Sequence, residues 1–463
     1  YAILRSNAIV VPINPMSVTA ELEHYVEDSG AKLALVAQEV YPQIKPLVGQ
    51  RIDRVIVAAY SDYAASNTTI RVPEVVSAPR QQINDPGVTL WAQALAANRR
   101  PGALTTGPND LCVIPYSSGT TGRPKGCMLS HSNVMHTLIS NSVWFSAHQC
   151  SNQLVVLPFF HVTSMQGGMN APLYQGSTIV LMCRWDREVA ADLIQRYRLT
   201  SWTAISTMVI DFLANPNLQQ YDLSSLQRVS GGGAAMPAAV GERLQNLIGS
   251  PYVEGYGLTE TIAPTHINPP DRPKRQCLGV PIFNTDSRVI DPETLQELPA
   301  GQVGEIVSHG PQIFQGYWRN EAATRAAFIE LDGKRFFRTG DLGYVDEDGY
   351  FFLVDRLKRM INASGFKVWP AEVEAQMYQH PAIQEACVIA AKDAHRGETV
   401  KAVVVLRPTF KGKVTEHEII EWTRQNMASY KHPRLIEFVD ALPKSATGKV
   451  QWRALQERET ARA

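Results

Sequence analysis

The stretch YSSGTTGRPKG, residues 116–126, decides how the rest of the chain is interpreted. The apolar run LCVIP, residues 111–115, precedes it and is typical of a buried strand that ends in a loop. The loop combines three glycines, four Ser or Thr hydroxyls and one lysine. Glycine lets backbone N–H groups approach an anion closely, while hydroxyls and a lysine add donors and positive charge. The composition predicts a phosphate-binding loop, although solvated Gly/Ser/Thr loops share it.

The loop is not of the Walker A type. That pattern ends in Gly-Lys-Ser/Thr, whereas here Pro124 precedes Lys125 and Gly126 follows it. The stretch resembles, residue for residue, the phosphate loop of the adenylate-forming superfamily, which includes acyl-CoA synthetases, peptide-synthetase adenylation domains and firefly-type luciferases. The resemblance implies that ATP or AMP is contacted by Ser117, Ser118, Gly119, Thr120, Thr121, Gly122 and Lys125.

Bulk properties of the chain restrict the possible classes of protein. Its 463 residues are too many for one core, so two or three structural units are expected. The 44 basic and 44 acidic residues cancel, which gives no indication of a nucleic-acid partner. No run of 18 apolar residues is present, so no transmembrane segment is expected. The cysteines are scattered without metal-ligand spacing and are expected to be reduced thiols of a cytoplasmic protein: Cys112, Cys127, Cys150, Cys183, Cys277 and Cys387.

Short apolar runs at residues 33–36 and 55–57 alternate with helical stretches, which predicts a mostly parallel sheet with flanking helices. The resemblance implies an α/β protein with a large AMP-binding domain of mixed and parallel sheets with flanking helices, residues 1–354. A small mobile C-terminal α/β domain, residues 356–463, would follow a hinge at Asp355. Family members usually carry some tens of residues before the position of Tyr1, so the N-terminal part of the large domain is expected to be missing.

A second motif is YVEGYGLTET, residues 252–261. It resembles the superfamily motif that closes the nucleotide site. The resemblance implies that Tyr256 stacks on the adenine, that Thr259 hydrogen-bonds the α-phosphate, and that Glu260 holds Mg²⁺, which prefers carboxylate and phosphate oxygens. The run SGGGAAMP, residues 230–237, resembles the loop that passes both the adenine and the acyl pocket, although a plain turn is the alternative. Further nucleotide contacts are expected from Gly233, Ala234, Glu254 and Gly255.

A third motif is RTGDLG, residues 338–343. By resemblance, Asp341 accepts hydrogen bonds from both ribose hydroxyls, because a carboxylate is an acceptor-only group with two oxygens. Asp348-Gly349 predicts a hairpin turn directly after this motif. The hairpin leads into DRLKRMI, residues 355–361, which matches the hinge of the family.

Two charged residues complete the implied nucleotide site. Arg356 follows the hinge and would reach the ribose or phosphate. Near the end of the chain, LPKSATGKV, residues 442–450, carries Lys449. A lysine in such a loop is usually solvent-exposed. Taken with the other motifs, Lys449 matches the mobile catalytic lysine of the family, which bridges the carboxylate and the α-phosphate.

The acyl side is less defined by sequence. By resemblance, the position of His161 favours a gate beside the carboxylate and the path of the thiol, although a lone His at a strand end more often has a structural hydrogen-bonding role. The run LPFFH, residues 157–161, lacks the Asp that pairs with the α-amino group in amino-acid adenylation domains, and an unpaired buried ammonium is costly. In the resembled family, the branch specific for acetate and propionate has Trp at the position of Gly257. The glycine therefore predicts an open channel for longer acids, and the alternative is that it only serves a tight turn. The residues expected to line the pocket are Val162, Ser164, Gly231, Gly232 and Gly257.

Together the motifs imply an AMP-forming acid–CoA ligase. ATP and a carboxylate would give an acyl-adenylate and pyrophosphate with Mg²⁺, and the thiol of CoA would then displace AMP. The chain is most like medium- or long-chain fatty acid–CoA ligases. An aryl or arylpropenoid acid, or transfer to a carrier protein instead of free CoA, remains open, although no carrier domain is fused to the chain. The expected partners are a small carboxylic acid and CoA, and a homodimer is left open.

Overall fold

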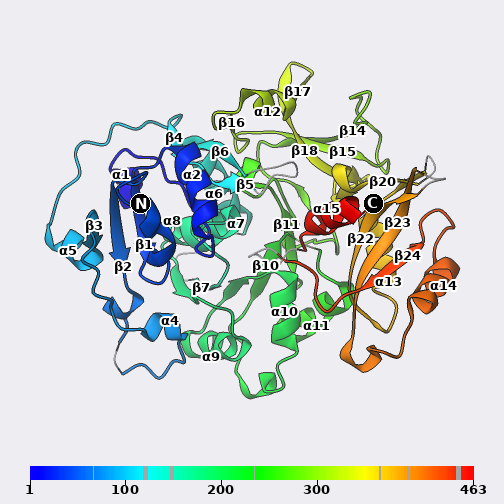
Figure 1. The fold of residues 1–463 in the computed structure, drawn as a ribbon, viewed down its shortest axis with the longest axis horizontal. Helices are drawn as coiled ribbons and strands as arrows, with labels where there is room; N and C mark the ends of the chain where they lie inside the picture. The colour runs from blue at the N-terminus through cyan, green and yellow to red at the C-terminus, as the bar shows by residue number, and fades with distance from the viewer. Residues whose placement is uncertain are drawn as a thin grey trace. The chain divides into compact units, whose positions relative to one another are not determined.

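The computed structural model describes residues 1–65, 67–117, 124–145, 151–233, 235–363, 366–393, 397–444 and 450–462. It divides the chain into two compact units: residues 1–286 with 309–335, and residues 287–308 with 336–463. Both units mix helices and sheets, which confirms the predicted α/β class (Figure 1). Among the described residues, no helix is long and apolar enough to cross a membrane.

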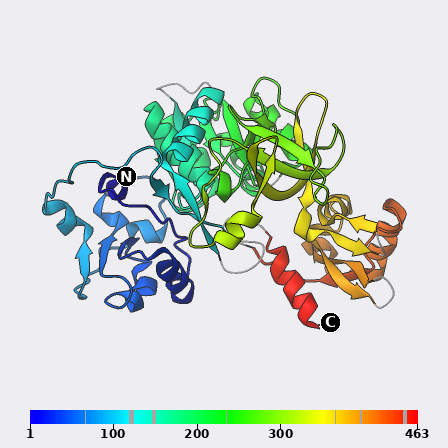
Figure 2. The same ribbon diagram turned by 90° about the horizontal axis from the view of Figure 1, so that it is seen from above.

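The first unit begins with a parallel sheet of three strands in the order β1 (Leu33–Ala37), β2 (Arg54–Ala58) and β3 (Val88–Leu90). Figure 2 shows these residues and their helices grouped together in blue. Helix α2 (Thr19–Ser29) buries Leu22 and Val26 in the core of this sheet and ends at Gly30, whose φ of 72° suits glycine. The other elements here are α1 (Ala2–Arg5), α3 (Tyr41–Ile44), η1 (Lys45–Leu47), η2 (Tyr60–Asp62), α4 (Glu74–Ser77) and α5 (Trp91–Ala96).

A larger sheet of seven strands forms the centre of this unit. Its order is β13 (Val280–Pro281), β12 (His266–Ile267), β11 (Val253–Tyr256), β10 (Arg228–Gly232), β9 (Ser201–Thr203), β7 (Asn152–Val155) and β8 (Thr178–Leu181). The strands from β11 to β8 are parallel, as the sequence predicts, and β12 and β13 are antiparallel. Its helices are α9 (Arg187–Tyr197), α10 (Ser206–Leu213) and α11 (Ala238–Ile248) (Figure 1).

The mostly aliphatic core beside this sheet contains a cluster of aromatic rings. The Trp202 and Trp185 rings stack with centroids 5.3 Å apart, and Phe212 packs against both. Stacked aromatic rings of this size dominate the energetics of a core. The short elements of this region are α7 (Val162–Ser164), the π-helix η3 (Met165–Asn170), α8 (Ala171–Gln175), η4 (Leu218–Gln220) and η5 (Thr259–Thr261).

A third sheet carries the strands around the predicted phosphate loop. Its order is β16 (Gly316–Tyr317), β6 (Lys125–Ser130) and β4 (Leu111–Val113), and β5 (Tyr116–Ser117) also pairs with β6. Helix α6 (His131–Trp144) follows β6 directly, because Ser130 caps its N-terminus by accepting a hydrogen bond from the Asn133 amide. Helix α12 (Glu321–Ala326) and β17 (Phe328–Leu331) complete the inserted segment 309–335.

The second unit has two sheets. One contains β14 (Asp286–Ile290), β15 (Gly304–His309) and β18 (Lys334–Val345), with β19 (Phe351–Arg356) paired to β18. The predicted turn at Asp348-Gly349 is confirmed, since Gly349 has a φ of 82° and Val345 pairs with Phe351. The other sheet has the order β21 (Phe366–Val368), β20 (Ile361–Ala363), β23 (Gly397–Leu406) and β22 (Ile383–Asp393), with β24 (Leu435–Phe438) beside β23. Its short helices are η6 (Leu357–Arg359) and η7 (Pro408–Phe410).

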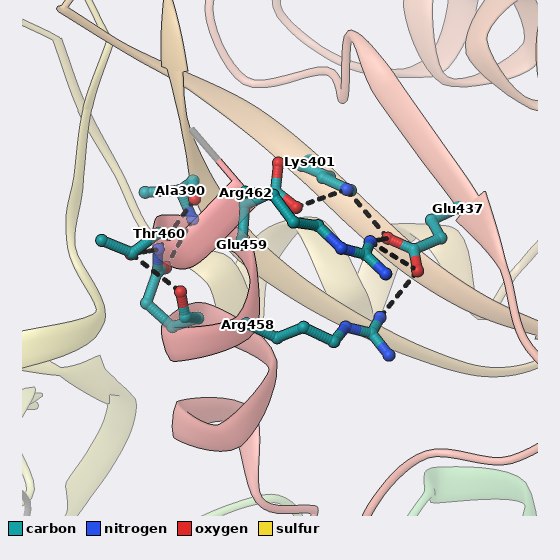
Figure 3. A network of polar contacts seen from close by, with 8 residues as sticks. Ala390, Lys401, Glu437, Arg458, Glu459, Thr460 and Arg462 are labelled. Atoms are coloured by element: carbon teal, nitrogen blue, oxygen red, sulfur yellow. Dashed lines mark hydrogen bonds and ion pairs between the residues drawn. The ribbon is translucent and has the colours of Figure 1, made fainter.

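Three helices cover this second sheet: α13 (Pro370–Met377), α14 (Glu416–Asn426) and α15 (Trp452–Arg462). The last of them is held by charges. Lys401 Nζ lies 2.8 Å from Glu437 Oε2 and 2.6 Å from Glu459 Oε2, and Arg458 reaches Glu437 at 2.7 Å (Figure 3). A network of partly buried pairs of this kind fixes a helix better than isolated surface pairs.

The two compact units differ in extent from the predicted domains, whose boundary at Asp355 stays a prediction. The predicted boundary lies at Asp355, but residues 287–308 and 336–354 belong to the second unit. The physical reason is strand pairing, because β18 and β19 pair through Leu342 and Asp355 and so tie the predicted hinge to a sheet that precedes it in sequence. Rotation about Asp355 remains a prediction.

Candidate active site

The strands that flank the predicted phosphate loop are short and antiparallel. Tyr116 pairs with Gly126, and Ser117 with Lys125, so β5 and β6 hold the two ends of the loop together. Ser117 is buried. Several predicted site residues lie outside the described part of the chain: Ser118, Gly119, Thr120, Thr121, Gly122, Ala234 and Lys449.

The lysine that follows the loop lies against an aromatic ring. Tyr317 is on β16, which pairs with β6, and Trp318 donates its backbone N–H to the Gly126 carbonyl at 2.8 Å. This pairing places Lys125 Nζ 4.0 Å from the centroid of the Tyr317 ring. An ammonium over a ring face gains about 0.5–2 kcal/mol from the ring quadrupole. Lys125 is thereby held at the base of the loop.

The same tyrosine also contacts the predicted magnesium ligand. Its hydroxyl donates a hydrogen bond to Glu260 Oε1 at 2.8 Å, and the Phe314 amide donates to the Glu260 carbonyl at 2.9 Å. Burial and the Glu260 carboxylate raise the pKa of Tyr317 well above its usual value, so the hydroxyl is protonated and donates. Tyr317 therefore brings Lys125 and Glu260, a cation and an anion from two separate motifs, to the same ring.

Glu260 fits one kind of metal site. It is 9% exposed, and the described residues contain no group of three or more His, Cys, Asp or Glu side chains that could hold a metal. A structural zinc or calcium site needs several protein ligands, whereas Mg²⁺ is commonly bound through one or two carboxylates plus substrate phosphates and water. A single carboxylate beside a phosphate loop can therefore hold Mg²⁺ that arrives with a nucleotide.

The Glu254 side chain is hydrogen-bonded to the protein backbone at both of its oxygens. Its two carboxylate oxygens accept the backbone N–H groups of Met236 at 2.8 Å and of Cys277 at 2.9 Å. Burial outweighs these bonds and raises the pKa of Glu254 to about 7. The side chain ties β11 to two loops, and its predicted nucleotide contact stays a prediction.

We expect Glu254→Gln to change how stability depends on pH. Because the folded pKa of about 7 lies above the ordinary 4.5, the native state keeps a proton that the unfolded chain loses. Stability from this group is therefore present below pH 4.5 and is lost as the pH rises to about 7, by on the order of 3 kcal/mol. Glutamine removes this slope, and it lowers stability by about 1–3 kcal/mol because its NH₂ faces a backbone donor.

Urea unfolding at pH 5 and pH 7.5 measures this effect, with the exposed Glu23→Gln as the matched control. The same fall in stability between the two pH values in Glu254→Gln and in the parent protein would contradict the assignment of the slope to Glu254.

Tyr256 lies on β11 and is 8% exposed, with its ring centroid 5.7 Å from that of His266. Full burial lowers the pKa of His266 to about 3, so this neighbour is a neutral ring at physiological pH. Gly255 pairs with Gly232 within the sheet, and Thr259 begins η5. The predicted adenine and α-phosphate contacts of Tyr256 and Thr259 stay predictions.

The glycines predicted to leave an open acyl channel have another role. A Cβ on Gly231 would lie 1.9 Å from the Ala204 carbonyl oxygen, and one on Gly232 would lie 2.1 Å from the Gly255 oxygen. On Gly257 it would lie 2.8 Å from Ala263 Cα. The space beside these glycines is thus filled by neighbouring backbone, and the tight-turn alternative explains Gly257 better than an open channel does. Gly233 follows the strand with a φ of 86°.

Residues 161–164 comprise the short helix α7 and its N-cap. His161 caps this helix, with Nδ1 accepting the Thr163 amide at 3.3 Å. Val162 is buried, and the buried Ser164 hydroxyl donates to the Leu157 carbonyl at 2.6 Å. The Ser164 hydroxyl is therefore used within the fold, and the roles of His161 as a gate and of Val162 as a pocket residue stay predictions.

In the second unit, two of the predicted nucleotide residues meet. Asp341 and Arg356 pair across β18 and β19, with Arg356 Nε 2.8 Å from Asp341 Oδ1. Asp341 is 1% exposed, whereas the guanidinium side is half-exposed. A carboxylate and a guanidinium presented side by side can accept from hydroxyls and donate to a phosphate, respectively.

Asp355 connects two elements of the second unit. Its Oδ1 accepts the Arg356 amide and its Oδ2 accepts the Ala371 amide, each at 2.6 Å. The second bond caps the N-terminus of α13, where a carboxylate is favoured by the unpaired N–H groups. Arg359, 3.7 Å away, is also paired with Glu374. Sequence patterns indicated the position of Asp355 but none of these partners.

Comparison with protein families gives a match over most of the chain. A family model described as AMP-binding enzyme matches residues 1–318, and one described as AMP-binding enzyme C-terminal domain matches residues 372–449. A long-chain-fatty-acid–CoA ligase of Bacillus subtilis is 34% identical, over 99% of this chain and 83% of the relative. A feruloyl-CoA synthase of an Amycolatopsis species is 33% identical, over 97% of this chain and 84% of the relative.

Solved structures agree with this match. ATP-bound MatB from Rhodopseudomonas palustris has a TM-score of 0.83 at 27% identity, over 99% of this chain and 85% of that protein. The anthranilate CoA ligase AuaEII in complex with anthranoyl-AMP also has a TM-score of 0.83, at 26% identity, over 99% of this chain and 84% of that protein.

Proposed function

The chain belongs to the family of AMP-binding enzymes, and from this premise we propose that it joins a medium- or long-chain fatty acid to CoA. The enzyme class is an AMP-forming acid–CoA ligase that binds ATP. The observation that supports the proposal most is the Tyr317 ring, which holds Lys125 and Glu260 beside the predicted phosphate loop. An anionic triphosphate with its magnesium ion needs a positive and a negative group at this spot.

In the first half of the proposed reaction, a carboxylate oxygen attacks the α-phosphorus of ATP. The bond between the α- and β-phosphates breaks, and pyrophosphate leaves with the bond electrons. The barrier comes from the approach of two anions, so positive groups that are already in place lower it. Lys125 and Lys449 would supply this charge, and Mg²⁺ bound through Glu260 would neutralise charge on the phosphates.

In the second half, the sulfur of CoA attacks the carbonyl carbon of the acyl-adenylate and AMP leaves. The C-terminal residues would first rotate about Asp355, which moves Lys449 away and admits the thiol. His161 would lie beside the path of the thiol. Asp341 and Arg356 would keep the ribose and phosphate of AMP bound through both halves.

The acid is proposed on two grounds. Residues 157–161 offer no carboxylate for an α-amino group, and the helices that follow bury Val162 and Met165, which are apolar. An aryl or arylpropenoid acid is the second candidate, because a relative named feruloyl-CoA synthase is nearly as similar, at 33% identity, as the one named long-chain-fatty-acid–CoA ligase, at 34%. Each buried CH₂ of a fatty acid adds about 0.8 kcal/mol of transfer free energy, before ordering costs.

A comparison of kcat/KM for acetate, octanoate, palmitate and a cinnamate-type acid distinguishes these candidates. We expect octanoate or palmitate to lead. A lead for the cinnamate-type acid would favour the aryl candidate, and a lead for acetate would contradict both.

We expect Tyr317→Phe to lower kcat/KM for ATP in adenylation by about tenfold, because the variant loses a hydrogen bond to the charged Glu260. The ring under Lys125 stays, so Tyr317→Leu, which removes both contacts, should lose more. Adenylation rates measured over a range of Mg²⁺ concentrations test whether the hydrogen bond from Tyr317 supports Glu260 as the magnesium ligand. An unchanged Mg²⁺ dependence in Tyr317→Phe would show that this hydrogen bond does not support the metal ligand.

A further inference from the structure

Helix α2 has two faces with different neighbours. Leu22 and Val26 pack into the core of the N-terminal sheet. His24 and Asp28, which are four residues apart, point to the other side of the helix, and Tyr25 lies between the two faces and also packs against the core. These three residues contact residues about 90–100 positions later in sequence. These later residues flank the predicted phosphate loop.

The first end of the loop is held by Asp28. The Tyr116 hydroxyl donates a hydrogen bond to Asp28 Oδ2 at 2.6 Å, and the Tyr25 ring packs edge-on against the Tyr116 ring with centroids 4.9 Å apart. Burial and the Asp28 carboxylate raise the pKa of Tyr116, so its hydroxyl stays a donor. The indole N–H of Trp318 donates to the Asp28 carbonyl at 3.0 Å. The 2.6 Å bond from the Tyr116 hydroxyl to the Asp28 carboxylate is charge-assisted, and bonds of this type and length are among the stronger ones.

The second end of the loop is held by His24. Its Nε2 lies 3.0 Å from the carbonyl oxygen of Pro124, the residue directly before Lys125. A carbonyl only accepts, so Nε2 carries the proton and donates. Tyr116 and Pro124 are therefore bound by side chains that lie four residues apart, one helical turn, on a rigid helix.

We propose that His24 and Asp28 are positioning residues that fix both ends of the phosphate loop and so set the affinity for the β- and γ-phosphates of ATP. This inference rests on the proposed function, since it assigns a purpose to a site already placed there. Phosphate-binding donors are effective when they are in place before the ligand arrives, and misplacement by about 1 Å can cost up to 100-fold. Helix α2 supplies this rigidity, because Leu22 and Val26 anchor it in the core of the N-terminal sheet, which is not the sheet that carries the loop.

The test compares ATP with AMP, because AMP lacks the phosphates that the loop would hold. Dissociation constants for both nucleotides are measured by calorimetry on the full chain. Tyr116→Phe and Asp28→Ala each remove the same hydrogen bond, and His24→Leu removes the other. Glu23→Ala is the matched control, because it deletes an exposed carboxylate from the same helix.

We expect the ATP dissociation constant to rise about tenfold in Tyr116→Phe and in Asp28→Ala, with no further rise when the two are combined. His24→Leu should add its own increase, because it acts at the other end of the loop. The AMP dissociation constant should stay within about twofold in every variant, as both should in Glu23→Ala.

Equal weakening of ATP and AMP would show that α2 serves the general fold, and unchanged ATP affinity would show that the loop does not depend on it. Either result overturns the inference, as does a parent protein that does not bind ATP. A parent that binds ATP but releases no pyrophosphate with any acid refutes the proposed function instead, and leaves the comparison of the two nucleotides as the test of α2.

Discussion

Replacement of Lys449 by alanine is expected to lower the rate of acyl-adenylate formation by roughly 10²- to 10³-fold or more, since it removes a positioned charge from the approach of two anions. Thioester formation from a supplied acyl-adenylate should remain largely intact, because the lysine serves only the first half of the proposed reaction. Single-turnover measurements of the two halves provide this comparison.

Structural damage is not expected to explain the loss, because the residues around the loop are anchored independently. Lys444 pairs with Val450, and the Gln451 amide donates to the Pro443 carbonyl at 2.8 Å. Beyond them, α15 is fixed by the pairs of Lys401 with Glu437 and Glu459 (Figure 3). Lys444→Ala is the control, because it removes a nearby charge that is paired with Glu385. Equal loss of both halves in Lys449→Ala would contradict a lysine that acts in one pose only.

Asp355→Pro is expected to have the opposite effect on the two halves of the proposed reaction, so that the second half is impaired and the first is not. Proline fixes φ near −65°, so a hinge that changes its backbone angles should be held in one pose. Adenylation should continue, and thioester formation should fall by at least about 100-fold. Rates of pyrophosphate release and of thioester formation measure the two steps.

The structure supplies the control that this experiment needs. Proline also removes the carboxylate that binds the Arg356 and Ala371 amides, and that loss alone costs stability. Asp355→Ala removes the same carboxylate and leaves φ free. A loss confined to the proline variant supports rotation at this residue, whereas equal thioester rates in both variants would show that the hinge lies elsewhere.

The sequence predicted the parts of the site that are contiguous in the chain. The motifs at residues 116–126 and 252–261 indicated Lys125 and Glu260 through their resemblance to superfamily motifs, because each has glycines and polar groups in the same order. Tyr317 was missed, although it contacts both. Its only signal was a Gly-Tyr-Trp run that reads as an ordinary turn, and its role depends on pairing between β6 and β16, which are separated by nearly 200 residues.

The contacts of α2 were missed for the same reason. His24 and Asp28 read as the polar face of an amphipathic helix, and only the folded chain places them on both ends of a loop about 90 residues later. For Gly257 the sequence left both an open channel and a tight turn possible, because a sequence does not reveal whether a glycine faces a ligand or a neighbouring backbone. Here Ala263 and Pro264 occupy that space.

The protein is expected to convert ATP to AMP and pyrophosphate when it activates a carboxylic acid. The most direct test follows pyrophosphate and AMP with ATP, Mg²⁺ and octanoate, palmitate or a cinnamate-type acid, with and without CoA. We expect pyrophosphate release only when the acid is present. Without CoA, release should stop at about one pyrophosphate per enzyme molecule, and with CoA it should continue, together with formation of AMP and acyl-CoA. Formation of ADP and phosphate, or no acid-dependent pyrophosphate with any of these acids, would contradict the account.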